Sequence, residues 1–222
     1  MGGPPRIRRQ EEDMARGPHR SALRLAAQVR AAIDEMPGLN VLGRDDLVGP
    51  GLSRDFDPLP VVIDVSGLGM SGYRAADWLR GAHRLDMHLV DHRRISAQLT
   101  HADSTATTQP LLDALRDLAA HAAEPADGRP VIDVPSGQDM RMEQTCRPRD
   151  AYFGPARAVP LEQAVGRVSA EMITPYPPGI PAVLPGERLT EPVLRYLRTG
   201  LRAGMNLPDA SDAELRTIRV RV

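Results

Sequence analysis

The first half of the chain shows apolar spacings typical of a small sheet covered by helices. Residues 21–36 repeat apolar side chains at near-helical intervals and predict a helix that "PGLN" terminates. "PVVIDV" at 60–65 predicts a strand, and Ser71 is placed to cap a second helix that ends near His83. The polar, aperiodic residues 1–20 are expected to be a mobile leader.

The next two apolar runs follow each other so closely that they predict an antiparallel pair. "LDMHLVD" at 85–91 and "RRISAQLTH" at 93–101 both resemble strands, and the connection is too short for a parallel crossover. With a short strand at 40–43 and a helix over 108–122, these elements form a small α/β subdomain at 21–122. The expected fold class is α/β (α+β), an α/β sandwich with a partly antiparallel sheet.

The chain changes character after residue 122. Residues 123–150 are expected to be a linker, opened by "AAEPADGRP", with a short strand at 130–135. Residues 151–222 are predicted to form a separate α+β C-terminal domain. Its elements are expected to be a helix at 160–173, a helix capped by Thr190 that reaches about Gly204, and a final strand at 214–222. The first of these helices would bury a stripe made of Leu161, Ala164, Val165, Val168 and Ile173.

Composition limits the class of protein. Hydrophobic residues make up 41% of the 222, which allows a buried core, and the net charge of -1 gives no general attraction to nucleic acid or anionic membranes. No apolar run is long enough to span a membrane, and no apolar segment follows the N-terminal arginines as in a secretory signal, so we expect a cytoplasmic protein. The sequence contains no lysine, so it can form no lysine Schiff base and has no lysine general base.

A glycine fingerprint follows the strand at 60–65. Gly67, Gly69 and Gly72 have the spacing of a dinucleotide-binding turn, and Asp86 or Asp91 could stand for its ribose-binding acid. The antiparallel pairing expected downstream leaves no room for the parallel sheet that such a site needs. The pattern therefore favours a structural turn over a nucleotide site.

Metal-binding and nucleophilic residues give weaker signals. His88 and His92 are four residues apart but fall on a predicted strand and turn, and neither they nor His101 and Cys146 have the spacing of a metal site. A lone cysteine such as Cys146 is more often an inert thiol than a nucleophile. We expect no metal site.

The stretch "TPYPPGIPAVLPGE" at 174–187 is the most unusual part of the sequence. Its five prolines exclude a helix and leave the backbone little conformational freedom. Rigid irregular backbone of this kind either crosses between two helices or holds a shape for binding. Tyr176 places a hydroxyl on this stiff segment, and Glu187 follows its last Pro-Gly turn.

These residues carry a resemblance to a known family. "AVGRVSAEMITPYPPGIPAVLPGERLTE" at 164–191 resembles the C-terminal-domain signature of the bacterial ornithine/lysine/arginine decarboxylases, and "CRPRDAYFGPARAVPLEQ" at 146–163 is similar to the segment that enters that domain. "AADWLRGAHRLDMHLVDHRRISAQLTHAD" at 75–103 is similar to the small subdomain that follows their cofactor-binding domain. The resemblance covers about residues 22–222.

The resemblance implies a carboxy-lyase of the aspartate-aminotransferase fold that uses pyridoxal phosphate. Such enzymes convert ornithine, lysine or arginine into putrescine, cadaverine or agmatine, at an active site on a dimer interface. By position in the motif, Tyr176 is implied to lie nearest the substrate channel. Glu187 is a second channel candidate, suited to a cationic substrate tail.

The chain also departs from the family. The family's cofactor lysine, its pyridine-binding aspartate and most of its phosphate cradle lie in a large domain without a counterpart in this sequence. We therefore expect the C-terminal part of such an enzyme, with no catalytic residue and no covalently held cofactor, inactive alone. Its partner would be a cofactor-domain polypeptide or a full-length decarboxylase subunit in a dimer-type association, docked on an exposed apolar surface.

Two alternatives remain open at this point. The chain could be a non-catalytic interaction module that docks on a full-length decarboxylase and modulates its assembly. It could also be a small nucleotide-binding protein that uses Gly67, Gly69 and Gly72.

Overall fold

The chain divides into two compact units, residues 1–128 and 129–222. The division falls within the stretch 123–150 that the sequence predicts as a linker. No helix among the described residues is long and apolar enough to cross a membrane. The computed structural model describes the ranges 5–122, 131–176 and 179–222, with side chains described from His19 onward.

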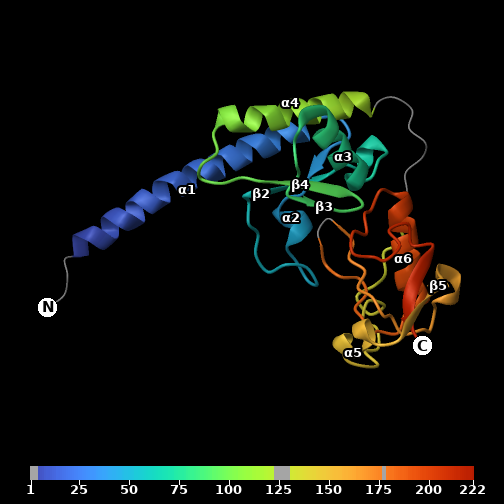
Figure 1. Ribbon diagram of the computed structural model, residues 1–222. Helices are drawn as coiled ribbons and strands as arrows, with labels where there is room; N and C mark the ends of the chain where they lie inside the picture. The colour runs from blue at the N-terminus through green and yellow to red at the C-terminus, as the bar shows by residue number, and fades with distance from the viewer. Residues whose placement is uncertain (1–4, 123–130, 177–178) are drawn as a thin grey trace. The chain divides into compact units, whose positions relative to one another are not determined.

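The first unit contains helices and a small sheet, shown in Figure 1. Its elements, in chain order, are α1 (Pro5–Asp34), β1 (Asn40–Val41), α2 (Arg44–Leu47), β2 (Pro60–Asp64), the 3-10 turn η1 (Ser66–Leu68), α3 (Gly72–His83), β3 (Leu89–Val90), β4 (Arg94–Gln98) and α4 (Thr105–His121).

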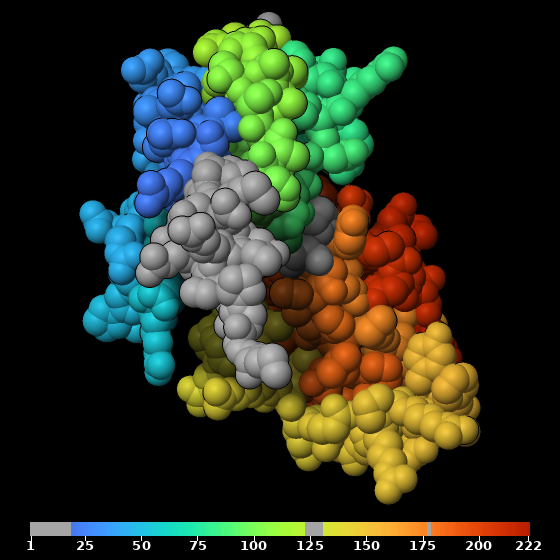
Figure 2. Space-filling view, turned by 90° about the vertical axis from the view of Figure 1, so that its left-hand side faces the viewer, coloured from blue at the N-terminus to red at the C-terminus, as the bar shows by residue number. Residues whose placement is uncertain are grey.

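The sheet of the first unit has the strand order β1-β2-β4-β3, and every neighbouring pair is antiparallel. The antiparallel pairing expected for the two runs after residue 85 is therefore confirmed. Helices α1, α3 and α4 lie on the same side of the sheet in Figure 1, and α4 lies beside α1 in Figures 1 and 2. The core between these layers includes Ile33, Ile63, Leu79, Ile95 and Leu115, all fully buried.

Helix α1 begins at Pro5, well before the start expected at Ser21. Residues 6–16 are mostly Arg, Gln, Glu, Met and Ala, which lose little free energy on entering a helix. These residues lack apolar periodicity, so the sequence pattern predicts no helix there. Residues 21–34 are helical as predicted.

The glycine turn after β2 is a structural connection. Gly69 ends η1 with φ of 74°, and the Ser71 hydroxyl accepts a hydrogen bond of 3.2 Å from the Arg74 amide, which confirms the predicted cap. The Gly72 amide donates to the His92 carbonyl, so the amides at the start of α3 already have protein acceptors. Since β2 pairs only with antiparallel strands in the described sheet, the parallel unit of a dinucleotide site is not formed here.

A charged cluster surrounds the turn between β3 and β4. The Arg93 guanidinium contacts the Asp64 carboxylate at 2.8 Å, and the Asp91 carboxylate accepts hydrogen bonds from the amides of Arg93 and Arg94. Burial opposes the charge on Asp64, but hydrogen bonds from Ser66 and Arg93 outweigh it and hold the pKa of Asp64 below its ordinary value. The cluster fixes this turn against β2.

His92 makes the stability of this turn dependent on pH. Burial of the imidazole lowers the pKa of His92, and Arg93 and Arg94 lower it further, while Asp91 and Asp64 oppose them. A pKa lower in the folded than in the unfolded state means that the unfolded chain binds more protons. The contribution of neutral His92 to the free energy of unfolding is therefore complete above pH 6.5, the ordinary pKa of histidine. This contribution is lost as the pH falls below that value.

We therefore expect the free energy of unfolding of the first unit to fall between pH 7.5 and pH 5.5, and the variant His92→Gln to show a smaller fall. Denaturation followed by the fluorescence of Trp78, the only tryptophan, reports this unit. His101→Gln, at an exposed histidine, is the matched control. An equal pH dependence in His92→Gln and the parent chain would contradict this assignment.

The second unit is built around a two-stranded antiparallel sheet and one longer helix. The helix expected after Thr190 and the final strand are both present, so these two predictions are confirmed. The described elements are α5 (Pro148–Phe153), β5 (Ala156–Pro160), the 3-10 turn η2 (Leu161–Gln163), α6 (Glu191–Arg202) and β6 (Thr217–Arg221).

Three local predictions in this unit are wrong. Residues 160–173 form only the short turn η2, because Gly166 takes φ of 77° and the following backbone pairs with neighbouring segments instead of with itself. Residues 131–135 are not a strand, and Val131 is 78% exposed. Thr190 precedes α6, but its buried hydroxyl makes no capping hydrogen bond.

Both units together give mixed helices and strands with small antiparallel sheets. The predicted α+β class is confirmed.

Candidate functional site

The proline-rich segment forms an arm of irregular backbone in the second unit. We call residues 172–187 the proline arm; residues 177 and 178 lie outside the described ranges. An antiparallel bridge pairs Ile173 with Val183, and each amide donates to the other's carbonyl, at 3.0 and 3.2 Å. Both side chains are fully buried, so one face of the arm packs against the unit.

Tyr176 is held by its backbone and presents its ring to solvent. The Tyr176 amide donates to the Asn206 carbonyl at 2.9 Å. The side chain is 55% exposed, and its ring lies against the backbone of Gly179. The role of Tyr176 in a substrate channel stays a prediction.

Glu187 closes the Pro-Gly turn that ends the arm. Its carboxylate oxygen Oε2 accepts a hydrogen bond of 2.7 Å from the Leu184 amide, and the Glu187 amide donates back to the Leu184 carbonyl. Gly186 takes φ of 89°, as the third residue of such a turn requires. One carboxylate oxygen thus fixes the turn, and within the described ranges Oε1 makes no hydrogen bond or ion pair.

The structure places Tyr176 and Glu187 on the same arm but does not join them. Among the described residues, no hydrogen bond links the two side chains. The arm is anchored near Tyr176 by Thr174, whose amide donates to Asp209 at 2.8 Å. Near Glu187 it is anchored by residues from the predicted linker, since the amide of Thr145 donates to the Gly186 carbonyl.

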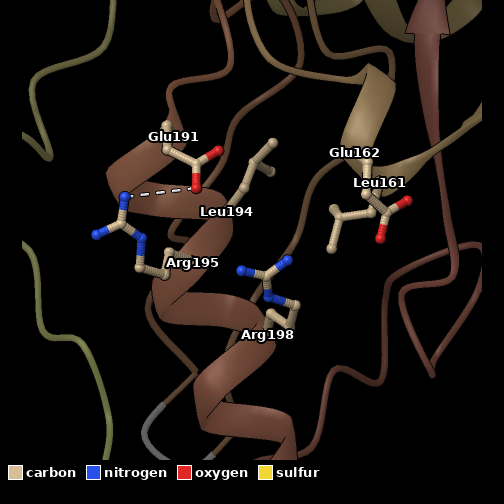
Figure 3. Close-up of a pocket in the computed structure, with 6 residues that line it drawn as sticks. All are labelled: Leu161, Glu162, Glu191, Leu194, Arg195 and Arg198. Carbon is tan, nitrogen blue, oxygen red and sulfur yellow. Dashed lines mark hydrogen bonds and ion pairs between the residues drawn. The ribbon is translucent and has the colours of Figure 1, made fainter.

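A separate hollow lies between η2 and α6, shown in Figure 3. It is small, opens to solvent, and has leucine side chains beside charged ones. Arg195 pairs with Glu191 at 3.5 Å, whereas Arg198 and Glu162 have no ion pair within the described part of the chain. The lining residues are Leu161, Glu162, Glu191, Leu194, Arg195 and Arg198.

Sequence reasoning missed this hollow. Glu191, Arg195 and Arg198 have the i, i+4, i+7 spacing of one helix face, which was available as a signal. The sequence pattern does not place Glu162 beside them, because it predicts a long helix where the structure has η2. Neither Tyr176 nor Glu187 lines the hollow.

The residues of this chain do not fit a covalently held pyridoxal phosphate. No lysine is present to carry it, and the amides of the glycine turn are engaged with protein acceptors instead of forming a phosphate cradle. Within the described ranges, no three His, Cys, Asp or Glu side chains gather in a way that could hold a metal ion.

Comparisons with known proteins identify relatives of both units. Residues 137–211 match the family model described as "Orn/Lys/Arg decarboxylase, C-terminal domain". The chain is 34% identical over 200 residues to an arginine decarboxylase of Bacillus anthracis and 36% identical over 200 residues to one of Halalkalibacterium halodurans. Each match covers 89% of this chain and 40% of the relative.

Solved structures show the same fold. The lysine decarboxylase LdcF of Francisella novicida matches with a TM-score of 0.66 and 20% identity, over 94% of this chain and 40% of that one. The resemblance that the sequence motifs carry is confirmed, and the chain spans about two fifths of the length of these relatives.

Proposed function

We propose that this chain acts as the C-terminal part of a pyridoxal-phosphate-dependent decarboxylase of basic amino acids. The similarity over 89% of the chain to proteins named arginine decarboxylase carries the proposal. Because the chain has no lysine, it depends on a cofactor-domain polypeptide for the chemistry and is inactive alone. The complex is a cytoplasmic, dimer-type assembly that makes di- or polyamine precursors.

The proline arm supplies the substrate-facing residues in this proposal. Glu187 is suited to the cationic tail of ornithine, lysine or arginine, because one carboxylate oxygen is fixed by the Leu184 amide while the other remains to accept a hydrogen bond. Tyr176 offers a ring and a hydroxyl on backbone that is tied to Asn206. Both are substrate-channel residues, not groups that carry out decarboxylation.

The test is release of CO2 from carboxyl-labelled arginine, the substrate named in the first relatives. We expect none from the purified chain with added pyridoxal phosphate. We expect release when the chain is mixed with the cofactor-domain part of the Bacillus anthracis arginine decarboxylase, the region outside the match. Glu187→Gln is expected to raise KM for arginine roughly tenfold or more, because it removes a charge-assisted contact.

Arg188→Gln is the matched control for Glu187→Gln, because it removes the charge of the neighbouring, exposed residue. Turnover by the chain alone would overturn the dependence on a second polypeptide. Binding without CO2 release would favour the interaction-module alternative. Stabilisation of the chain by a dinucleotide in a thermal shift experiment would favour the nucleotide alternative.

A further inference from the structure

The proline arm carries no charged side chain except at its last residue, Glu187. No Asp, Glu or Arg lies between Glu171 and Glu187, although 26% of the chain is charged. Exposed protein segments usually carry charges, because charged groups are the most easily hydrated. An exposed segment without any charge is typical of a surface that a partner covers.

The arm has a buried face and an exposed face. Ile173 and Val183 are fully buried, whereas Met172 and Leu184, which flank them, are 37% and 38% exposed. Thr174 and Ala182 are also buried, so the buried face lies at the bridge and the exposed apolar side chains lie on either side of it. Beyond the bridge, Tyr176 and the 69% exposed Ile180 extend the apolar face.

The arm is held in place before any partner binds. The Thr174 hydroxyl and amide both bond to the Asp209 carboxylate, and the arm's other end is tied through the Gly186 carbonyl to Thr145. Prolines reduce the freedom of the intervening backbone. A surface held in this way loses little entropy on binding, which favours affinity.

We propose that Met172, Tyr176, Ile180 and Leu184 form the docking face for the cofactor-domain polypeptide; the proposal rests on the proposed function. Two observations select this occupant. A face without charge suits a folded, apolar protein surface and not a nucleic acid or an ionic ligand. The relatives have about three fifths of their length beyond the part that this chain matches, and that region is a partner of the required kind.

The experiment measures the Kd between the full chain and the cofactor-domain part of the Bacillus anthracis arginine decarboxylase by sedimentation. We expect binding, and a Kd weakened roughly thirtyfold or more in Ile180→Asp, because a charge would be buried in an apolar contact. Leu184→Ser is a second, milder variant that should weaken binding in the same direction. Circular dichroism checks that the fold is kept.

Phe153→Asp is the matched control, since Phe153 is apolar and 78% exposed but lies on α5, outside the arm. Its Kd should stay within about twofold of the parent value. No binding, equal weakening in all variants, or self-association of the chain through Ile180 would overturn the docking face. CO2 release that is insensitive to Ile180→Asp would reject this inference and leave the proposed function standing. If binding is weakened by Ile180→Asp but no CO2 is released, the docking face would stand and the proposed function would be rejected.

Discussion

Replacing Gly72 by alanine is expected to destabilise the first unit by roughly 3 kcal/mol or more. A Cβ atom at this position would collide with the backbone carbonyl oxygens of Asp91 and Arg94. Those carbonyls cannot move away easily, since the Asp91 amide donates to the Arg94 carbonyl and the Asp91 carboxylate accepts two further amides. The methyl group would therefore push α3 away from the turn between β3 and β4.

A matched control lies in the same helix. Gly81 is in the interior of α3, and a Cβ built there meets nothing within 4 Å, so Gly81→Ala should stabilise the unit by about 0.5–1 kcal/mol. Urea denaturation followed by Trp78 fluorescence measures both variants. If Gly72→Ala lowers the free energy of unfolding by less than about 1 kcal/mol, the turn can shift to make room for the methyl group. Close packing would then not be the reason for glycine at this position.

The glycine motif shows how far sequence reasoning could reach. The strand, the turn, the Ser71 cap and the antiparallel pairing could be predicted, because short connections and local hydrogen bonds decide them. The contact of Gly72 with the turn near Asp91 could not, since it depends on how α3 packs against distant backbone. The glycines therefore matched a nucleotide fingerprint by spacing alone.

The stretch 160–173 shows where sequence reasoning failed. Its apolar residues have near-helical spacing, yet Val165 is 46% exposed while Ala170 is fully buried. Periodicity cannot show that Glu171 will be buried as an acceptor for distant amides, because those amides belong to residues more than thirty positions away. The arm that follows was predicted as rigid and irregular because proline acts locally.

The Glu171 carboxylate was overlooked by sequence reasoning and is central to the second unit. The residue is only 2% exposed. Its Oε2 accepts from the Ser211 amide at 2.7 Å and its Oε1 from the Arg219 amide at 2.5 Å. One side chain thus joins the base of the proline arm to β6 and to the loop before it.

Glu171→Ala is expected to destabilise the second unit by about 3 kcal/mol, because two part-buried amides lose their acceptor and the removal of the buried side chain leaves a cavity. Glu171→Gln should lose less, since its amide oxygen can still accept one of the two hydrogen bonds. Amide hydrogen exchange at Ser211 and Arg219 measures the effect locally, and both amides should lose protection in the alanine variant. Glu162→Gln, at an exposed carboxylate of the same unit, should stay within about 0.5 kcal/mol of the parent chain. Unchanged protection of both amides in Glu171→Ala would mean that other groups hold the arm to β6, and the docking face would then not depend on this carboxylate.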